Sequence, residues 1–336
     1  MKIERVQEIL NKIRNVKIAV YGDFCLDAYW FLDPMGGEIS AETGLRSRAV
    51  KKHYYRLGGG SNVVANVAAL APAQIKVIGA VGNDIFGREV KRQMQACGVD
   101  ISSLVIQEEN FNTVTFSKVI LDDREQPRID FGFFNQRNEE TDKQILQSLR
   151  HALEIFDALI FNQQVPCSLA NDSFIDGVNQ LLDEFDDRIV LLDTRHYGRR
   201  FQNIIRKTND VEASCLNGIE AHVLDKISLE DSKKNAQKLF TESGKPVFLT
   251  RGSQGILVVD RDGINEVPGI KLSGKLDTVG AGDTVVGALG LCLGAGLTPA
   301  EAAEFANLAA GVTVQKLFMT GTASGEEILE VCKNVF

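Results

Sequence analysis

The chain has 336 residues, of which 44% are apolar and 24% are charged, and these proportions exclude disorder as its main state. Its formal net charge is −8, and no block of Lys and Arg gives it the basic face of a nucleic-acid-binding protein. No apolar run is long enough to span a membrane, and the N-terminus lacks the apolar core of a signal peptide. We therefore expect a cytoplasmic protein that binds neither nucleic acid nor membrane.

The nearest approach to a basic patch is a cluster within residues 46–56. Its first interpretation is a solvated edge strand, and the alternative is a site for a small anionic ligand. The cluster comprises Arg46, Arg48, Lys51, Lys52 and Arg56.

Predicted strands and helices alternate along most of the chain. Short runs rich in β-branched residues predict buried strands, and longer segments with helical periodicity predict helices. This alternation predicts an α/β fold with a mostly parallel central sheet and helices on both faces. The predicted strands are 16–21, 75–81, 158–161, 188–192, 213–216, 246–250 and 255–259, and the predicted helices are 62–70, 84–97, 141–155, 168–185, 229–243, 282–295, 299–316 and 325–334.

Two stretches, at about 29–57 and 104–134, have a different pattern. Apolar and polar residues alternate there, which predicts strands with one exposed face. We interpret them as a small antiparallel β lid that projects from the main body. No repeat or low-complexity linker divides the chain, so we predict a single domain over 1–336 that carries this lid.

Ligands of parallel α/β sheets bind beyond the carboxyl ends of the strands. Several polar residues directly follow predicted strands, so we expect them at this edge of the sheet. They are Asp23 and Asp27 after the first strand, Asp193 after 188–192, Asn217 after 213–216, and Arg251 with Gly252 after 246–250.

The most informative motif is the octet DTVGAGDT at residues 277–284, which leads into a predicted helix. It places Gly280, Ala281 and Gly282 at a helix N-terminus, where backbone N–H groups lack intrahelical partners and the helix dipole favours anions. Small residues let phosphate oxygens approach the backbone. The octet therefore predicts an anion hole for a phosphoryl group.

Asp283 lies in the first turn of the same helix and can accept a proton from an attacking hydroxyl. We expect the helix dipole to favour its ionised form, which makes it a weak base, and phosphoryl transfer with a dissociative transition state tolerates a weak base. The alternative is that Asp277 and Asp283 serve as helix caps.

The octet resembles the C-terminal signature of the ribokinase-like (PfkB) carbohydrate kinases, and further motifs of that family precede it in the order that the family requires. The resemblance runs from about residue 16 to the C-terminus and implies the ribokinase-like fold and kinase activity. The further motifs are Gly58-Gly59-Gly60-Ser61-Asn62 with Asn66, Gly79-x-x-Gly82-x-Asp84-x-x-Gly87, Asn217-x-x-Glu220, and Thr250-x-Gly252-x-x-Gly255.

The resemblance also implies roles for individual residues, with ATP and Mg²⁺ as cofactors. Asp283 would be the base, and Gly280, Ala281 and Gly282 the anion hole. The remaining assignments are Asp27, Gly59, Gly60 and Asn62 for the sugar; Thr250, Gly252, Gly255 and Asn307 for the nucleotide; Asn217 and Glu220 for the phosphates and for Mg²⁺ held through water; and Asp277 for a monovalent cation such as K⁺.

Two of these assignments have structural alternatives. Asn217 and Glu220 also fit a turn followed by a helix N-terminus. Arg128 fits a lid residue that is purely structural and, equally, a ligand for a phosphate on the acceptor, because Arg binds phosphate in a bidentate manner. Arg46 and Arg48 are further candidates for that phosphate.

Within the family, several segments look most similar to the kinases of heptose 7-phosphate. Residues 22–30, 39–42 and 128–131 carry this likeness. The chain departs from that group at 162–167, where Asn-Gln-Gln-Val-Pro-Cys stands in place of SDY-x-KG, and at 193–195, where Asp-Thr-Arg stands in place of the beginning of DPKG. At 162–167 a lysine and an aspartate are therefore missing at a position that should face the substrate.

The sequence thus predicts an ATP-dependent kinase that acts on a hydroxyl of a sugar or sugar phosphate, with a heptose 7-phosphate-like acceptor as one candidate. A nucleoside kinase of the same fold and a binding protein without turnover are the alternatives. Open lid edges need cover, so we also predict a homodimer formed through the β lid.

Overall fold

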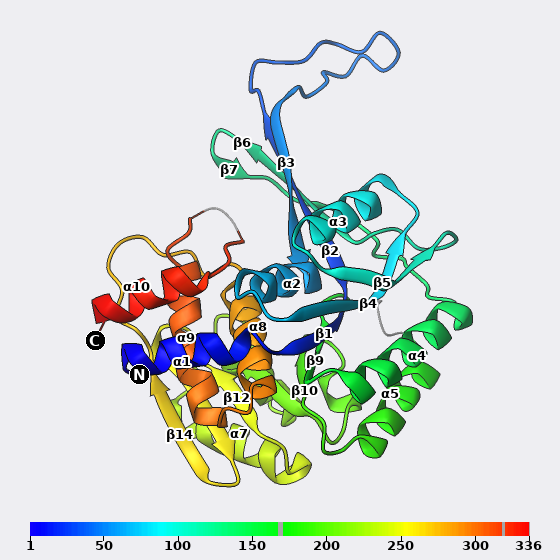
Figure 1. The fold of residues 1–336 in the computed structure, drawn as a ribbon. Helices are drawn as coiled ribbons and strands as arrows, with labels where there is room; N and C mark the ends of the chain where they lie inside the picture. The colour runs from blue at the N-terminus through cyan, green and yellow to red at the C-terminus, as the bar shows by residue number, and fades with distance from the viewer. Residues whose placement is uncertain (167–170, 318–319, 336) are drawn as a thin grey trace.

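The computed structural model describes residues 1–166, 171–317 and 320–335, and its main body is one twisted sheet between helices (Figure 1). The strands of this sheet run parallel, apart from two antiparallel strands at one edge. Within the described residues the order across the sheet is β14 (Gly263–Pro268), β13 (Gly255–Asp260), β12 (Val247–Thr250), β11 (Ile205–Asn209), β10 (Val190–Thr194), β9 (Ala158–Gln163), β1 (Lys17–Gly22), β4 (Gln74–Gly82) and β5 (Asp100–Gln107).

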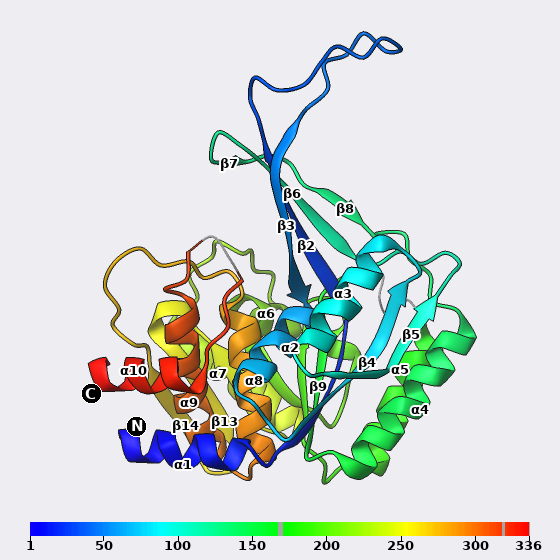
Figure 2. The ribbon, with the colours of Figure 1, turned by 45° about the horizontal axis from the view of Figure 1, so that its top comes forward.

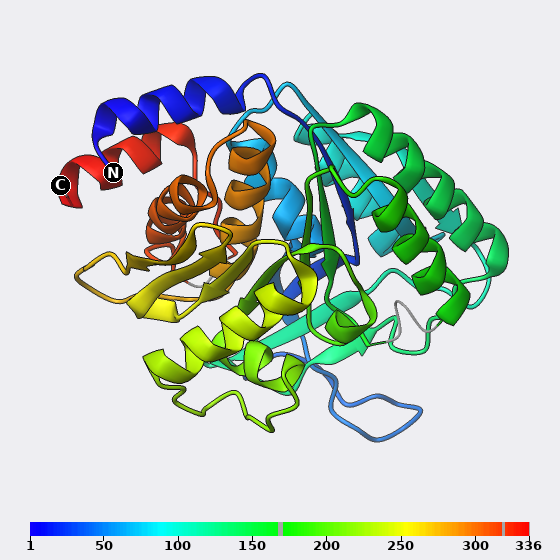
Figure 3. The same cartoon turned by 90° about the horizontal axis from the view of Figure 1, so that it is seen from below.

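Helices cover both faces of this sheet, as Figure 3 shows from below. One group packs around a large apolar core: α1 (Ile3–Ile13), α2 (Gly60–Ala69), α3 (Ile85–Ala96), α8 (Ala281–Gly294), α9 (Pro299–Thr313) and α10 (Gly325–Val335). The other group covers two further core clusters: α4 (Glu139–Ile155), α5 (Asp172–Glu184), α6 (Asp210–Leu216) and α7 (Leu229–Ser243).

Strand β1 shows why the sheet is buried on both faces. Ile18 and Val20 pack into the first core, whereas Ala19 and Tyr21 point to the opposite face and pack into the second. Side chains alternate between the two faces of a strand, so a continuous apolar run supplies both cores.

A second sheet projects from the body as the predicted lid (Figures 1 and 2). It begins earlier than predicted, at Phe24, and residues 104–107 belong to β5 of the main sheet instead. Most of its strand pairs are antiparallel, although β2 and β6 run parallel. Its strands are β2 (Phe24–Leu32), β3 (Val50–Gly59), β6 (Thr115–Leu121), β7 (Arg124–Glu125) and β8 (Ile129–Phe131).

Outside the lid, one predicted element has the wrong type, and strand β14 and helix α6 were not predicted. Residues 213–216 were predicted as a strand, and this prediction is wrong, because they form the end of helix α6. The strand in this part of the sheet is β11, and its sequence lacks an apolar pattern because Arg206 and Lys207 are charged although they are buried. Asn209 then ends the strand and caps α6. Of the predicted helix 168–185, residues 168–170 lie outside the described residues.

None of the helices in the described residues has the length and apolar character needed to cross a membrane.

Candidate active site

A cavity of 630 Å³ opens at the carboxyl ends of β10, β11 and β12, against the N-terminus of α8. This is the edge at which ligands of parallel sheets bind. Eight residues predicted from the sequence line it together: Gly280, Ala281, Gly282, Asp283, Thr250, Gly252, Gly255 and Asn307.

The α8 N-terminus has the geometry of an anion site. Gly280 is its N-cap in the left-handed conformation, with φ +81°, and a Cβ there would lie 3.0 Å from Nδ2 of Asn62. Glycine is therefore required by the backbone and by this close approach. The next residues, Ala281 and Gly282, also line the cavity. The Ala281 N–H donates to the Thr278 carbonyl at 3.2 Å, which leaves the Gly282 N–H as the candidate donor of this first turn.

Asp283 lies in this first turn and is held by a residue from another helix. The Asn62 amide, from α2, donates to its Oδ2 at 2.7 Å. Asn62 is itself fixed, because Asn66 donates to its carbonyl at 2.9 Å and accepts from Thr284 of α8 at 2.7 Å. The glycine-rich segment of the lid junction is thus coupled directly to the orientation of Asp283.

The pKa of Asp283 is raised to about 6. Burial is the main cause and the charge of Asp193 adds to it, against the Asn62 hydrogen bond, Lys207 and Arg195, which lower the pKa. The raised pKa differs from the expectation that the ionised form would be favoured, because burial disfavours the charged carboxylate. A pKa near 6 suits a group that accepts a proton at neutral pH.

Sequence reasoning missed a lysine beside Asp283. Lys207, from β11, is 8% exposed, and its Nζ lies 3.0 Å from Oδ1 of Asp193 on the neighbouring strand. The same Nζ would lie 3.2 Å from a Cβ added to Gly282, so it sits against the anion hole. Lys207 lies near the carboxyl end of β11, so a correct assignment of this strand from the sequence would have placed the lysine at the ligand-binding edge.

The predicted phosphate and Mg²⁺ residues Asn217 and Glu220 do not line the cavity. Asn217 ends α6 and donates its amide to the carbonyl of Asn235 at 3.0 Å. The Glu220 side chain is 89% exposed. The structural alternative, a turn followed by a helix N-terminus, also differs from the structure, because Asn217 is the C-cap of α6 and the next helix begins only at Leu229.

Asn209 and Glu212 line the cavity instead, with the same N-x-x-E spacing. They form a capping box at the start of α6, in which Asn209 accepts from the Glu212 N–H at 2.8 Å and Glu212 accepts from the Asn209 N–H at 3.0 Å. The spacing occurs twice in the chain, and only the correct strand assignment selects this copy.

The predicted sugar residues gather where the lid meets the body. Asp27 is 4% exposed, and Lys118 of β6 donates to its Oδ2 at 2.9 Å. Burial raises the pKa of Asp27, against the opposing charges of Lys118 and Arg128. A Cβ on Gly59 would lie 2.8 Å from the Cys25 sulfur, and one on Gly60 would lie 3.0 Å from the Asp23 carbonyl, so the chain passes closely here.

Arg128 lies in the lid near Asp27, where it pairs with Asp130 at 3.0 Å and stacks 4.8 Å above the Phe116 ring. Its side chain remains 44% exposed. These contacts are compatible with a structural role and leave the guanidinium open to a ligand.

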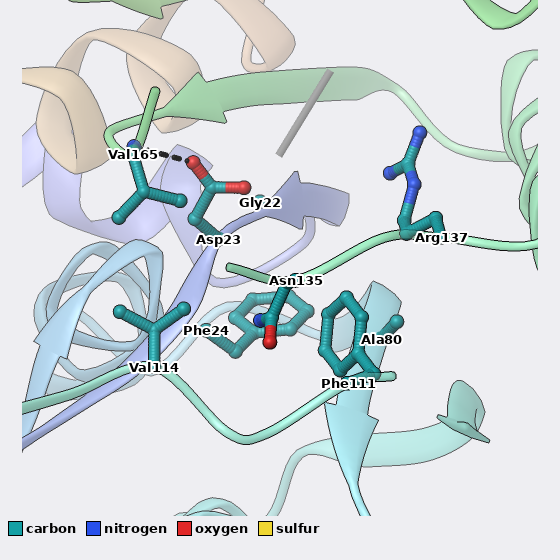
Figure 4. Close-up of a pocket in the computed structure, with 9 residues that line it drawn as sticks. All are labelled: Gly22, Asp23, Phe24, Ala80, Phe111, Val114, Asn135, Arg137 and Val165. Carbon is teal, nitrogen blue, oxygen red and sulfur yellow. Dashed lines mark hydrogen bonds between the residues drawn. The ribbon is translucent and has the colours of Figure 1, made fainter. Parts of the chain in front are cut away.

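Asp23 has an internal role. Its Oδ2 accepts from the backbone N–H of Gln164 at 2.6 Å and of Val165 at 2.9 Å, and Figure 4 shows the second of these bonds. The cavity beside it measures 20 Å³, room for about one water molecule. Asp23 thus shapes the segment after β9, where the sequence departs from the heptose 7-phosphate kinases; of that segment, Cys167 lies outside the described residues.

Asp277 lies just before the anion hole. Its N–H donates to the Val314 carbonyl at 2.8 Å, and its Oδ1 accepts from the Val279 N–H at 3.0 Å. Among the described residues no group of three or more His, Cys, Asp or Glu is arranged to hold a metal ion.

Comparison with known proteins identifies the family. The sequence matches the pfkB family of carbohydrate kinases over residues 16–324, which is most of the chain, so the protein belongs to that family. The bifunctional protein HldE of Helicobacter hepaticus is 31% identical over 320 residues, covering 94% of this chain and 64% of the relative. HldE of Coxiella burnetii (strain Dugway) is 30% identical over 306 residues, covering 90% and 60%. The chain spans less than two thirds of the length of these relatives.

Solved structures confirm the ribokinase-like fold. Ribokinase of Arabidopsis thaliana, solved with ribose and ATP, superposes with a TM-score of 0.72 at 20% identity and covers 95% of this chain and 99% of that one. Phosphofructokinase-2 of Escherichia coli, solved with potassium, gives 0.73 at 18% identity, with the same two coverages.

Proposed function

We propose that the protein transfers the γ-phosphoryl group of ATP to a hydroxyl of a sugar or sugar phosphate. The observation that carries the proposal is the juxtaposition of Asp283, with its pKa near 6, and the α8 N-terminus in one cavity at the sheet edge. A base and an anion hole in the same helical turn are what transfer to a hydroxyl requires.

The far part of the cavity fits a nucleotide. Ile256, Ile270 and Leu272 give it an apolar wall that suits an adenine ring. Thr250, Gly252 and Gly255 form the loop beside this wall, and Asn307 of α9 lies nearby with its amide bound to the Pro268 carbonyl at 2.9 Å. We assign these four residues to nucleotide binding.

The fit to Mg²⁺ depends on Glu212. Its carboxylate lines the cavity and lies close enough to raise the pKa of Lys207. Mg²⁺ keeps several waters and needs few protein ligands, so one carboxylate that holds it through water, with Asn209 beside it, is sufficient. When bound, the ion would neutralise phosphate charge. Glu220 has no part in this proposal.

The acceptor sugar lies between lid and body in this proposal. Asp27 accepts hydrogen bonds from its hydroxyls, Gly59 and Gly60 allow close approach, and Asn62 keeps Asp283 directed at the reacting hydroxyl. Arg128 is proposed to bind a phosphate on the acceptor. A heptose 7-phosphate is the first candidate, because of the similarity at 22–30 and 128–131 and the matching HldE relatives.

A coupled assay of ADP release over sugars, sugar phosphates and nucleosides tests the proposal. We expect turnover with a sugar or a sugar phosphate. Turnover with nucleosides alone would favour the nucleoside kinase. No turnover on the panel, together with ligand binding that Asp283→Asn leaves unchanged, would favour a binding protein.

The pH dependence of the reaction follows from Asp283. The carboxyl must be ionised to accept a proton, and its pKa is raised to about 6. We therefore expect kcat/KM to fall as the pH drops through about 6, whereas an unshifted Asp would keep activity down to about pH 4. A profile measured from pH 4.5 to 8.5 that stays flat to pH 4.5 would contradict this assignment.

We also propose a homodimer formed through the lid. Strand β3 is at the edge of the lid sheet within the described residues, and the connection from β2 to β3 extends furthest from the body (Figure 1). This connection exposes 85% of Met35, 65% of Ile39 and 71% of Leu45, and exposed apolar side chains beside an open edge favour association. Light scattering should give twice the mass of the chain; a monomer at assay concentrations would refute the dimer.

A monovalent cation beside Asp277 also remains a prediction. Activity that rises when K⁺ replaces a bulky organic cation in the assay would support it.

A further inference from the structure

We infer that Lys207 is a catalytic residue that contacts the transferring phosphoryl group, and that Asp193 is the residue that positions it. The inference rests on the proposed function and adds a second source of positive charge to the anion hole. The lysine expected in segment 162–167 is missing from the sequence, and Lys207 brings a cation to the cavity from a different strand.

The position of Lys207 follows from the sheet. It occupies β11 directly opposite Asp193 of β10 in the parallel register, near the carboxyl ends of both strands. Its Nζ is 3.0 Å from Asp193 Oδ1. On its other side is Gly282, and a Cβ added to that glycine would lie 3.2 Å from the same Nζ. It therefore lies between the carboxylate that holds it and the helix N-terminus that binds the phosphoryl group.

Asp193 is held in turn by the segment that departs from the heptose 7-phosphate kinases. Its Oδ2 accepts from the Asn162 amide at 3.0 Å and from the Gln164 amide at 3.3 Å. Lys207 occupies the other oxygen, so every described contact of this carboxylate serves to orient it. The amides at 162 and 164 and the lysine at 207 form one connected unit.

The charge state of Lys207 suits this role. Burial lowers its pKa, but Asp193, Glu212 and Asp283 outweigh burial and leave the pKa raised. The group is therefore a cation at neutral pH. An ammonium has three donors, and one hydrogen bond to Asp193 leaves donors for phosphate oxygens. Burying a cation costs desolvation free energy that the attraction within an ion pair often does not exceed, so this pair is weak evidence for a purely stabilising role.

The chemical step needs this cation. The acceptor oxygen forms a bond to the γ-phosphorus as the bond from that phosphorus to the β,γ-bridging oxygen breaks. The electron pair of the broken bond leaves with ADP, and the hydroxyl proton passes to Asp283. Lys207 and the N–H group of Gly282 hold the charge on the phosphoryl oxygens during the transfer.

The test compares Lys207→Met with Lys207→Arg. We expect kcat to fall about 10²–10³-fold in Lys207→Met, as when one donor is removed from an oxyanion hole, with ADP affinity unchanged and partial recovery in Lys207→Arg. Lys76→Met is the control, because it removes the cation of a different partly buried ion pair, with Asp100, and should leave kcat unchanged. A Lys207→Met enzyme within tenfold of wild type would overturn the inference.

Two further readouts separate a catalytic from a structural lysine. Asp193→Asn/Lys207→Met removes both charges and relieves any cost of an unpaired buried ion, so recovery of activity in this double variant would overturn the inference. The acid limb of the pH profile should move to higher pH in Lys207→Met and to lower pH in Asp193→Asn, because Lys207 lowers and Asp193 raises the pKa of Asp283. Arg195 also faces Asp283 and is unchanged in both variants.

A third readout needs no acceptor. Mg–ADP with aluminium fluoride imitates the transferring phosphoryl group, and wild type should bind it more tightly than Mg–ADP alone. Lys207→Met should lose this gain, and a gain kept in full would contradict the inference. Absence of kinase turnover in wild type would instead count against the proposed function.

Discussion

Asp283→Asn is expected to lose turnover by about 10²–10⁴-fold, the usual contribution of a general base, while its affinity for ATP is largely kept. The amide has the shape of the carboxylate but accepts no proton. Because Asn62 donates to Oδ2 of Asp283, the oxygen of the introduced amide can still accept this bond, and the α8 N-terminus stays in place. Kinetics with a calorimetric ATP titration measure both effects.

The control for this variant is Asp231→Asn. Asp231 is the third residue of α7, as Asp283 is the third residue of α8, and both are first-turn carboxylates. If Asp283 acted only as a cap or through the helix dipole, the two variants would behave alike. An Asp283→Asn enzyme that retains more than about a tenth of the activity would refute the base, since general-base effects exceed that factor.

Glu212→Gln is expected to lower kcat/KM by about 10–100-fold, the range for residues that hold a metal through an intervening ligand, and to raise the Mg²⁺ concentration that gives half-maximal activity. Gln at this position still completes a capping box, so helix α6 should remain intact. The variant therefore removes the negative charge of Glu212 and should leave the fold intact.

Glu220→Gln is the matched comparison, because it changes the acidic residue of the second N-x-x-E copy, outside the cavity. Its activity and Mg²⁺ dependence should equal those of wild type. If Glu220→Gln were the impaired variant and Glu212→Gln the normal one, the site built here around β11 would be wrong.

Much of the fold and the central motif could be predicted from sequence. The octet at 277–284 places glycines and Asp283 at a helix start, because small residues followed by an apolar helix have few other local solutions. Asn62 could also be selected, since it follows three glycines. Its bond to Asp283, however, spans 221 positions in sequence and depends on how α2 and α8 pack.

The errors have a common cause in β11. Arg206 and Lys207 are charged yet buried, so hydrophobic pattern does not reveal their strand. The apolar run at 213–216 predicts a strand instead, and a strand there points to the second N-x-x-E copy, at 217–220. The pairing of Lys207 with Asp193 arises between neighbouring strands and has no local signature.

The raised pKa of Asp283 could not be predicted from the sequence for a related reason. The motif shows that Asp283 lies at a helix N-terminus, but the desolvation that raises its pKa comes from residues elsewhere in the chain.

The stoichiometry of the reaction distinguishes phosphoryl transfer to a sugar hydroxyl from hydrolysis of ATP. Purified protein with Mg–ATP and the best sugar or sugar phosphate of the panel should form one ADP for each new phosphate ester, followed by ³¹P NMR. The same mixture with Asp283→Asn should form neither product at a comparable rate. ADP that appears with inorganic phosphate and no ester, or ester formation undiminished in Asp283→Asn, would contradict the account.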